Sequence, residues 1–220
     1  HGGCAILWNS RLDTCIRPLP NMGGDRICVV QITINEVHYY VISAYMPHQT
    51  CKISDYDEEI HMLQQVCNEC SGKGHVIALG DVNAHLGPEY GSRCWGNTTR
   101  NGRLYVRSMY ECGMDIVDIG EKGAGPCHTF ASTNGLSYID HCAISDNLVP
   151  FVNSCNIIED AVHNTSDHLA ISVSINILHH TLDAENISRK QVAWGKLDDK
   201  TIMELYTQPL EQAVTSILGK

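Results

Sequence analysis

The chain has 220 residues, of which 43% are hydrophobic, and a formal net charge of −10 at pH 7. This length fits one large domain, or one domain with an appendage, and the apolar content permits a sizeable core. No apolar run approaches the ~18 residues of a membrane span and no basic region precedes an apolar stretch, so we expect an intracellular protein, nuclear or cytoplasmic, without membrane contact. The acidic charge argues against an extended nucleic-acid interface, because binding there depends on Lys and Arg contacts to phosphates.

Three segments in the first fifty residues are rich in β-branched and aromatic residues, which favours strands. They are residues 4–9, 27–34 and 37–46. Asn35-Glu36 predicts a tight hairpin between the last two. Apolar residues at spacings of three and four predict a helix over residues 54–70, with Ser54 as its N-cap. The apolar run 75–80 predicts the next strand, which ends in the polar stretch GDVNAH.

The second half predicts a short helix over residues 102–112 and several further strands. These strands are residues 115–119, 128–132, 138–145, 155–162 and 169–177. Residues 179–220 begin with a polar linker and continue with two short helices separated near Pro209. Many strands with few helices predict an α+β domain whose two sheets pack face to face, with the helices outside.

The 11 cysteines are spread through apolar and polar runs alike, which is typical of reduced thiols buried as small hydrophobic side chains. Cys67 and Cys70 form a CxxC, but no second CxxC and no HxxxH supplies the other ligands of a structural zinc site. We therefore interpret the pair as helix neighbours and expect no structural zinc.

Polar side chains follow or interrupt the apolar runs at four places. They are Tyr45, Asp81 with Asn83, Asp140, and Asp167 with His168. Carboxylates with a histidine are the groups that metal-assisted hydrolysis requires, because a metal stabilises phosphoryl charge and a base activates water. In extended backbone Asp81 and Asn83 lie on one face, and Val82 points the other way into packing.

Structural interpretations of the same residues remain open at this level. An Asp-x-Asn after a strand is usually a turn former, and a single histidine is often a satisfied polar residue. Asp140 lies within an apolar strand and needs a partner, for which the adjacent His141 is a natural candidate. The residues alone therefore permit either a hydrolase or metal site, or a set of structural polar groups.

Taken in order, five segments resemble the motifs of the endonuclease/exonuclease/phosphatase superfamily over about residues 1–178. They are HGGCAILWN, SAYMP, GDVNAH, YIDHCAIS and TSDHLAI, with HTF (128–130) between the third and the fourth. CWGNTTRNGRLY is similar to the endonuclease domain of non-LTR retrotransposon polyproteins. AWGKLDDKTIMELY (193–206) is similar to the segment that leads to their reverse transcriptase.

The resemblance implies a DNase I-like two-sheet sandwich flanked by helices and a monomeric, Mg²⁺- or Mn²⁺-dependent DNA endonuclease. His168 would pair with Asp140 and act on the scissile phosphate or its attacking water. Asp81 would orient or deprotonate that water.

The resemblance also implies that Asn83 and Tyr45 bind the phosphate, and that Asp167 lies near the metal with Asp81. In the family, an asparagine motif and a glutamate, the principal metal ligand, precede the strand that resembles HGGCAILWN. Residues 1–12 contain no carboxylate. We therefore expect a domain that lacks its first strands, with an open sheet edge and with weak or no activity by itself.

Two other functions remain open beside the endonuclease. The acidic charge favours a phosphatase or phosphodiesterase of the same fold that acts on a small or lipid phosphate. The missing asparagine and glutamate favour a non-catalytic remnant that keeps the fold.

Overall fold

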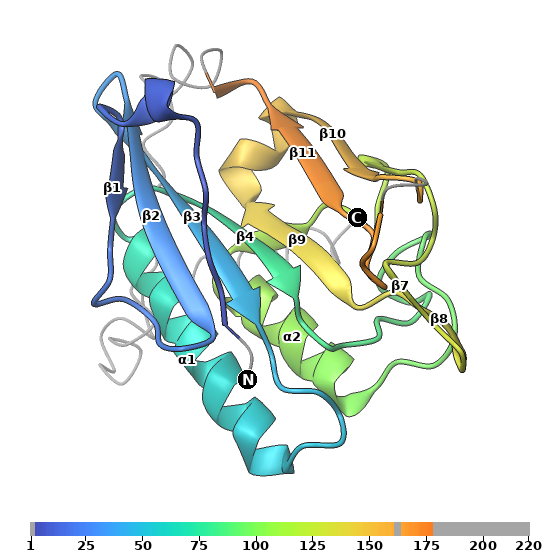
Figure 1. Cartoon of the computed structure of the whole chain (residues 1–220). Coiled ribbons are helices and arrows are strands. Elements are labelled where there is room, and N and C mark those ends of the chain that lie inside the picture. Colours follow the sequence, from blue (N-terminus) through green and yellow to red (C-terminus); the bar gives the residue numbers. More distant parts are fainter. Residues whose placement is uncertain (1–2, 161–163, 178–220) are drawn as a thin grey trace, which may run out of the picture. The chain divides into compact units, whose positions relative to one another are not determined.

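The computed structural model describes residues 3–160 and 164–177, which contain two main β-sheets and two α-helices (Figure 1). The larger sheet has, in spatial order, β1 (Ile16–Pro18), β2 (Ile27–Ile34), β3 (Val37–Tyr45), β4 (His75–Asp81), β9 (Asp140–Ser145) and β5 (Met114–Ile116). β3 and β4 run parallel, with α1 (Ile53–Ser71) as their crossover, and the other neighbours in this sheet are antiparallel.

The smaller sheet has the order β11 (Ile171–Ile175), β10 (Val152–Ile157) and β6 (Gly123–Ala124). A separate hairpin joins β7 (Phe130–Ser132) to β8 (Gly135–Ser137). The remaining helical elements are α2 (Arg100–Glu111) and the 3₁₀ turns η1 (Ser10–Leu12) and η2 (Asp146–Phe151). This mixed architecture with two main sheets and few helices confirms the α+β class that the sequence predicts.

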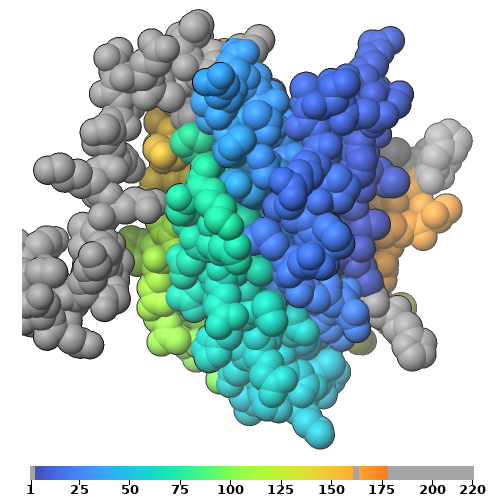
Figure 2. Space-filling model, turned by 90° about the vertical axis from the view of Figure 1, so that its left-hand side faces the viewer, coloured from blue at the N-terminus to red at the C-terminus, as the bar shows by residue number. Residues whose placement is uncertain are grey.

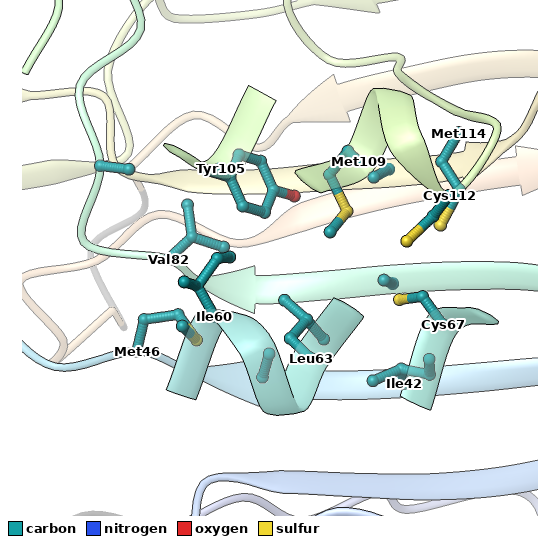
Figure 3. Close-up of a cluster of buried hydrophobic side chains, with 14 of the residues drawn as sticks. Ile42, Met46, Ile60, Leu63, Cys67, Val82, Tyr105, Met109, Cys112 and Met114 are labelled. Atoms are coloured by element: carbon teal, nitrogen blue, oxygen red, sulfur yellow. The ribbon is translucent and has the colours of Figure 1, made fainter. Parts of the chain in front are cut away.

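Two buried clusters lie on opposite faces of the larger sheet, as the alternation of strand side chains requires. Along β3, Tyr40 and Ile42 belong to the cluster that includes residues of α1 and α2, whereas Tyr39 belongs to the cluster that includes residues of β10. Figure 3 shows side chains of the first cluster, which includes Ile60 and Leu63 of α1 and Met109 of α2. The helices therefore cover one face, and the smaller sheet packs against the other.

The hairpin predicted at Asn35-Glu36 is confirmed. β2 and β3 pair up to Ile34 and Val37, and the two turn residues have φ angles of 48° and 68°. Both angles lie in the left-handed region that two-residue hairpin turns require and that glycine usually fills. The helix predicted over 54–70 is α1, whose buried side chains include Cys67 and Cys70. Figure 2 shows the outer surface of α1, in cyan, beside the blue N-terminal segment.

The prediction of a strand over residues 4–9 is wrong. No strand of the described chain pairs with this segment, and Leu7 is 95% exposed. Its contact with the sheet is made by a side chain, since the Cys4 thiol donates to the carbonyl oxygen of Arg26 (3.0 Å). Apolar β-branched sequence favours a strand only where a neighbouring strand offers backbone partners.

The N-cap of α1 also differs from the prediction. Lys52 occupies this position and makes no side-chain cap, while Ser54 lies inside the helix and donates to Asp55. The predicted linker and helices of residues 179–220 lie outside the described residues. None of the helices in the described part combines the length and the apolar character that crossing a bilayer requires.

Candidate active site

Three neighbouring strands bring polar side chains together at one end of the larger sheet. In the parallel pair β3 and β4, Tyr45 lies opposite Asp81, and in the antiparallel pair β4 and β9, Asp81 lies opposite Asp140. The three residues therefore form one row across the sheet, on the strands that Figure 1 shows side by side. The Arg26 guanidinium lies 5.0 Å from the centre of the Tyr45 ring and fixes that end of the row.

Gly80 allows β4 to approach β3 closely just before Asp81. Its φ of +146° is a conformation that L-residues rarely adopt, and a Cβ atom there would lie 2.0 Å from the carbonyl oxygen of Ala44. The glycine of the GDVN motif is thus required by the backbone that positions Asp81.

The chain turns sharply after Asp81, and Asn83 folds back on it. The Asn83 backbone N–H donates to Asp81 Oδ1 (3.0 Å), and its side-chain Nδ2 donates to Asp81 Oδ2 (3.0 Å) and to the carbonyl oxygen of Met46 (2.9 Å). Val82 points the opposite way, into the core between the helices (Figure 3). Both amide hydrogens of Asn83 are engaged within the protein, so a phosphate contact from this amide group would have to replace one of these bonds.

The environment of Asp81 makes its carboxylate basic. Burial is the main cause and the neighbouring charge of Asp140 adds to it, and together they raise the pKa of Asp81 to about 6. Hydrogen bonds from Asn83 and the charge of His168 oppose this rise. A general base works best with a pKa near the working pH, so Asp81 is suited to accept a proton.

Asp140 holds His168 in the same corner. Nδ1 of His168 lies 2.9 Å from Asp140 Oδ2, and because a carboxylate accepts, Nδ1 carries the donated proton and Nε2 is left for other contacts. This hydrogen bond is the main cause that raises the pKa of His168 above its ordinary value. The Phe130 ring packs on the imidazole, with 4.9 Å between the ring centres.

Thr129, which sequence reasoning did not single out, connects the segments of Asp140 and His168. Its buried Oγ1 accepts hydrogen bonds from the backbone N–H groups of Ile139 (3.1 Å) and Asp140 (3.0 Å). Its carbonyl oxygen accepts from the N–H of Leu169 (2.7 Å). Its position in HTF, a few residues before the apolar strand that carries Asp140, was the sequence feature that could have indicated this role.

The expectation that His141 partners Asp140 is wrong, because the two residues point to opposite faces of β9. Nδ1 of His141 lies 2.8 Å from Asp118 Oδ2, and both side chains are fully buried. The other oxygen of the Asp118 carboxylate accepts from the N–H of Cys142 (2.7 Å). Asp118 is a second residue that sequence reasoning missed, since nothing in DIVDI marks one aspartate as buried.

Asp167 is exposed beside His168, and its carbonyl oxygen accepts from the N–H of Ala131 (2.9 Å). Within residues 3–160 and 164–177, no three His, Cys, Asp or Glu side chains converge to hold a metal ion. Hard divalent cations prefer oxygen ligands, and Mg²⁺ often takes one or two carboxylates with water and phosphate oxygens. The carboxylate of Asp81, which lies opposite Asp140 across the strand pair, fits this chemistry as one ligand of a coordination shell.

The structure thus combines a two-sheet fold with a His–Asp pair beside a second carboxylate. Residues 39–172 match the sequence model of the family described as "Endonuclease-reverse transcriptase". The chain therefore belongs to the endonuclease-reverse transcriptase family. No curated protein matches it.

Solved structures show the same fold. The endonuclease domain of TRAS1, a telomere-specific non-LTR retrotransposon, superposes with a TM-score of 0.56 at 20% identity over 73% of this chain and 66% of that domain. The 3′ phosphatase NExo from Neisseria, bound to a product DNA hairpin, gives 0.54 at 17% identity over 73% and 70%. The AP endonuclease LMAP from Leishmania major gives 0.52 at 13% identity over 68% and 54%. The chain thus spans just under two thirds of the TRAS1 domain.

Proposed function

We propose that this chain is the endonuclease domain of a retrotransposon-like element and a divalent-metal-dependent hydrolase of phosphodiester bonds in DNA. The observation that carries this proposal is the convergence of the hydrogen-bonded pair Asp140 and His168 with the desolvated carboxylate of Asp81. A basic carboxylate beside an oriented imidazole gives one group to activate water and another to stabilise charge on phosphate.

In this mechanism Asp81 orients the attacking water and accepts its proton as the water oxygen bonds to phosphorus, for which a pKa of about 6 is suitable. The P–O bond to the leaving strand breaks, and the leaving oxygen takes a proton from solvent. Asp140 holds the imidazole of His168 by its Nδ1–H, so that Nε2 faces the scissile phosphate. Because the bond to Asp140 favours the protonated ring, His168 donates a hydrogen bond to the phosphoryl oxygens as negative charge develops there.

The remaining residues orient Asp81 and bind the phosphate and the cation. Asn83 holds the Asp81 carboxylate by two hydrogen bonds, and Tyr45 lies next to Asp81 in register, within reach of the phosphate side of the row. Asp81 and Asp167 would hold the cation, Mg²⁺ or Mn²⁺, which would neutralise charge on the phosphate when bound. Further oxygen ligands would come from water and substrate.

DNA is the substrate we propose, because the family is named for an endonuclease and the solved relative from Neisseria was crystallised with DNA. The net charge of −10 favours the alternative of a small or lipid phosphate, since a basic surface is the usual requirement for an extended DNA interface. Turnover of an inositol phosphate or sphingomyelin without cleavage of DNA would favour that alternative.

The test is the nicking of supercoiled plasmid by purified protein in Mg²⁺ and in Mn²⁺. We expect weak nicking that is abolished by chelation and reduced by roughly 10²- to 10⁴-fold in His168→Ala, the range for loss of an acid–base group. His61→Ala, at an exposed position of α1, is the matched control and should nick at the wild-type rate. Plasmid that stays intact with both metals would contradict the proposal and favour a non-catalytic remnant.

A further inference from the structure

The turn that follows Asp81 is held by three buried side chains from three different elements. The carbonyl oxygen of Val82 accepts from the Tyr56 hydroxyl on α1 (3.0 Å). The next carbonyl, of Asn83, accepts from Nδ2 of Asn101 on α2 (3.4 Å). The third, of Ala84, lies 3.3 Å from Nε2 of His141 on β9. A carbonyl oxygen only accepts, so Nε2 of His141 carries a proton here, and a further proton is shared between Nδ1 and the Asp118 carboxyl group.

These bonds matter because the three carbonyl groups lie outside the regular strands, where the backbone contact of the turn is made by the Val82 N–H, which donates to the carbonyl oxygen of Ile139 (3.0 Å). Asn83 has a φ of +46°, in the left-handed region that non-glycine residues adopt only when their surroundings enforce it. Asn83 itself is 5% exposed, and buried carbonyl groups outside strands need other donors. Side chains that donate to the carbonyls on either side of a strained residue can enforce its conformation.

The donors are themselves fixed. The Asp118 carboxylate holds Nδ1 of His141 at 2.8 Å, which directs Nε2 towards Ala84. The Tyr105 and Tyr138 rings lie 5.9 and 5.1 Å from the imidazole, between ring centres, and restrict its rotation. His141 is therefore a rigid donor.

The start of α2 also holds the residue that follows Ala84, His85. The Thr99 N–H donates to the carbonyl oxygen of His85 (3.1 Å), and the His85 N–H donates to Thr99 Oγ1 (3.2 Å). A Cβ atom at Gly102 would lie 2.0 Å from that same His85 carbonyl oxygen. Asn101 thus donates to the carbonyl oxygen of Asn83, and the missing side chain of Gly102 lets α2 pack closely against the backbone of His85. This gives a physical reason why a chain with GDVNAH also contains NGR.

We propose that Tyr56, Asn101 and His141 are positioning residues that hold the turn of Asn83 so that it donates to the Asp81 carboxylate. The inference rests on the proposed function for its catalytic consequence, but the geometry of the turn can be tested without cleavage. Releasing any of the three carbonyl oxygens should loosen Asn83 and misorient Asp81, while the contacts that bind substrate stay in place.

The first measurement is hydrogen exchange of the Asn83 backbone amide, whose N–H donates to Asp81. In Tyr56→Phe, which removes one hydroxyl, we expect exchange at Asn83 to accelerate by roughly tenfold relative to amides of β9. Ser145→Ala is the matched control, because it removes a buried hydroxyl whose partners are the N–H (2.7 Å) and the carbonyl oxygen (3.4 Å) of Val76, at the opposite end of β4 from Asp81. Asn101→Ala is a second release variant and should give the same local effect if Tyr56→Phe folds poorly.

The second measurement is plasmid nicking by the folded variants. We expect Tyr56→Phe and Asn101→Ala to lower kcat while KM stays unchanged, and Ser145→Ala to alter neither. Exchange at Asn83 that is unchanged in both release variants would overturn the inference. The wild-type protein itself could fail to nick DNA while exchange at Asn83 still accelerates in the release variants. That result would support the inference and contradict the proposed function.

Discussion

His168 and Asp140 are 28 residues apart in the chain, yet Nδ1 of the histidine lies 2.9 Å from Oδ2 of the aspartate. Both are partly accessible, with side chains 30% and 13% exposed, so the pair is open to solvent and substrate. The pair formed by His141 and Asp118 has almost the same distance, 2.8 Å, and no exposure. Accessibility, more than hydrogen-bond geometry, separates a pair suited to catalysis from one suited to holding the backbone.

Asp140→Asn should reduce cleavage and shift its pH dependence. The amide keeps the shape but removes the charge, so the pKa of His168, which Asp140 raises, returns towards its ordinary value. If protonated His168 stabilises the phosphate, the fall of activity on the alkaline side should begin at lower pH in the variant. We expect a loss of roughly 10²- to 10⁴-fold near neutral pH.

The pH profile of kcat/KM for plasmid nicking provides this test. Asp115→Asn, an exposed carboxylate on the edge strand β5, is the control and should leave the profile unchanged. An alkaline limb at the same pH in Asp140→Asn and in the wild type would show that Asp140 does not tune His168.

The strands that carry the site could be predicted because their own residues specify them. Apolar β-branched runs predicted the strands of Tyr45 and Asp81. The period of two also predicted that Val82 points away from Asp81 and Asn83, which is the case, although the backbone there is a turn with a left-handed Asn83 and not an extended strand. The same period separates Asp140 from His141, although adjacency in the sequence favoured pairing them. Face assignment was therefore predictable where the chain is extended.

Partners across the fold could not be predicted in the same way. Asp118 lies 23 residues from His141, and only the pairing of β5 with β9 brings their segments together. The left-handed φ of Asn83 is likewise imposed by donors from distant elements. Residues 4–9 form no strand because no strand of the described chain pairs with them. Local propensity does not contain such long-range information.

Asp81→Asn should abolish cleavage and yet stabilise the fold at pH 7. The folded state raises the pKa of Asp81 to about 6, so ionisation between pH ~4 and 6 is easier in the unfolded chain. The unfolded state then binds fewer protons than the folded state, and stability falls as pH rises through this window. A neutral amide removes the penalty, which we expect to amount to roughly 1–3 kcal/mol at pH 7.

Urea denaturation of wild type and Asp81→Asn at several pH values gives the measurement. The gain in the free energy of unfolding should be present at pH 7. It should disappear below pH ~4, where Asp81 of the wild type is protonated and as neutral as the asparagine of the variant. A variant that is less stable than wild type at neutral pH would show that the hydrogen bonds from Asn83 outweigh the cost of burying the charge.

Gly80→Ala should destabilise the protein and displace Asp81. The new Cβ would meet the carbonyl oxygen of Ala44 at 2.0 Å, and the φ of +146° is strained for alanine. We expect a loss of roughly 2–4 kcal/mol in the free energy of unfolding, since strain and steric overlap act together. Gly120→Ala is the control, because its Cβ would meet no atom within 4 Å, and a similar loss there would refute the steric explanation.

Thr129→Val should separate the hydroxyl of Thr129 from its shape. Valine fills nearly the same volume but leaves the buried N–H groups of Ile139 and Asp140 without their shared acceptor. The cost of two unsatisfied buried donors is roughly 2–5 kcal/mol, and Asp140 should move relative to His168. Thr129→Ser keeps the oxygen and loses a methyl group, so its loss should stay near ~1 kcal/mol. Thermal denaturation of both variants, with NMR of the His168 imidazole, measures the two effects. Equal destabilisation by valine and serine would mean that packing, and not the hydrogen bonds to β9, gives Thr129 its role.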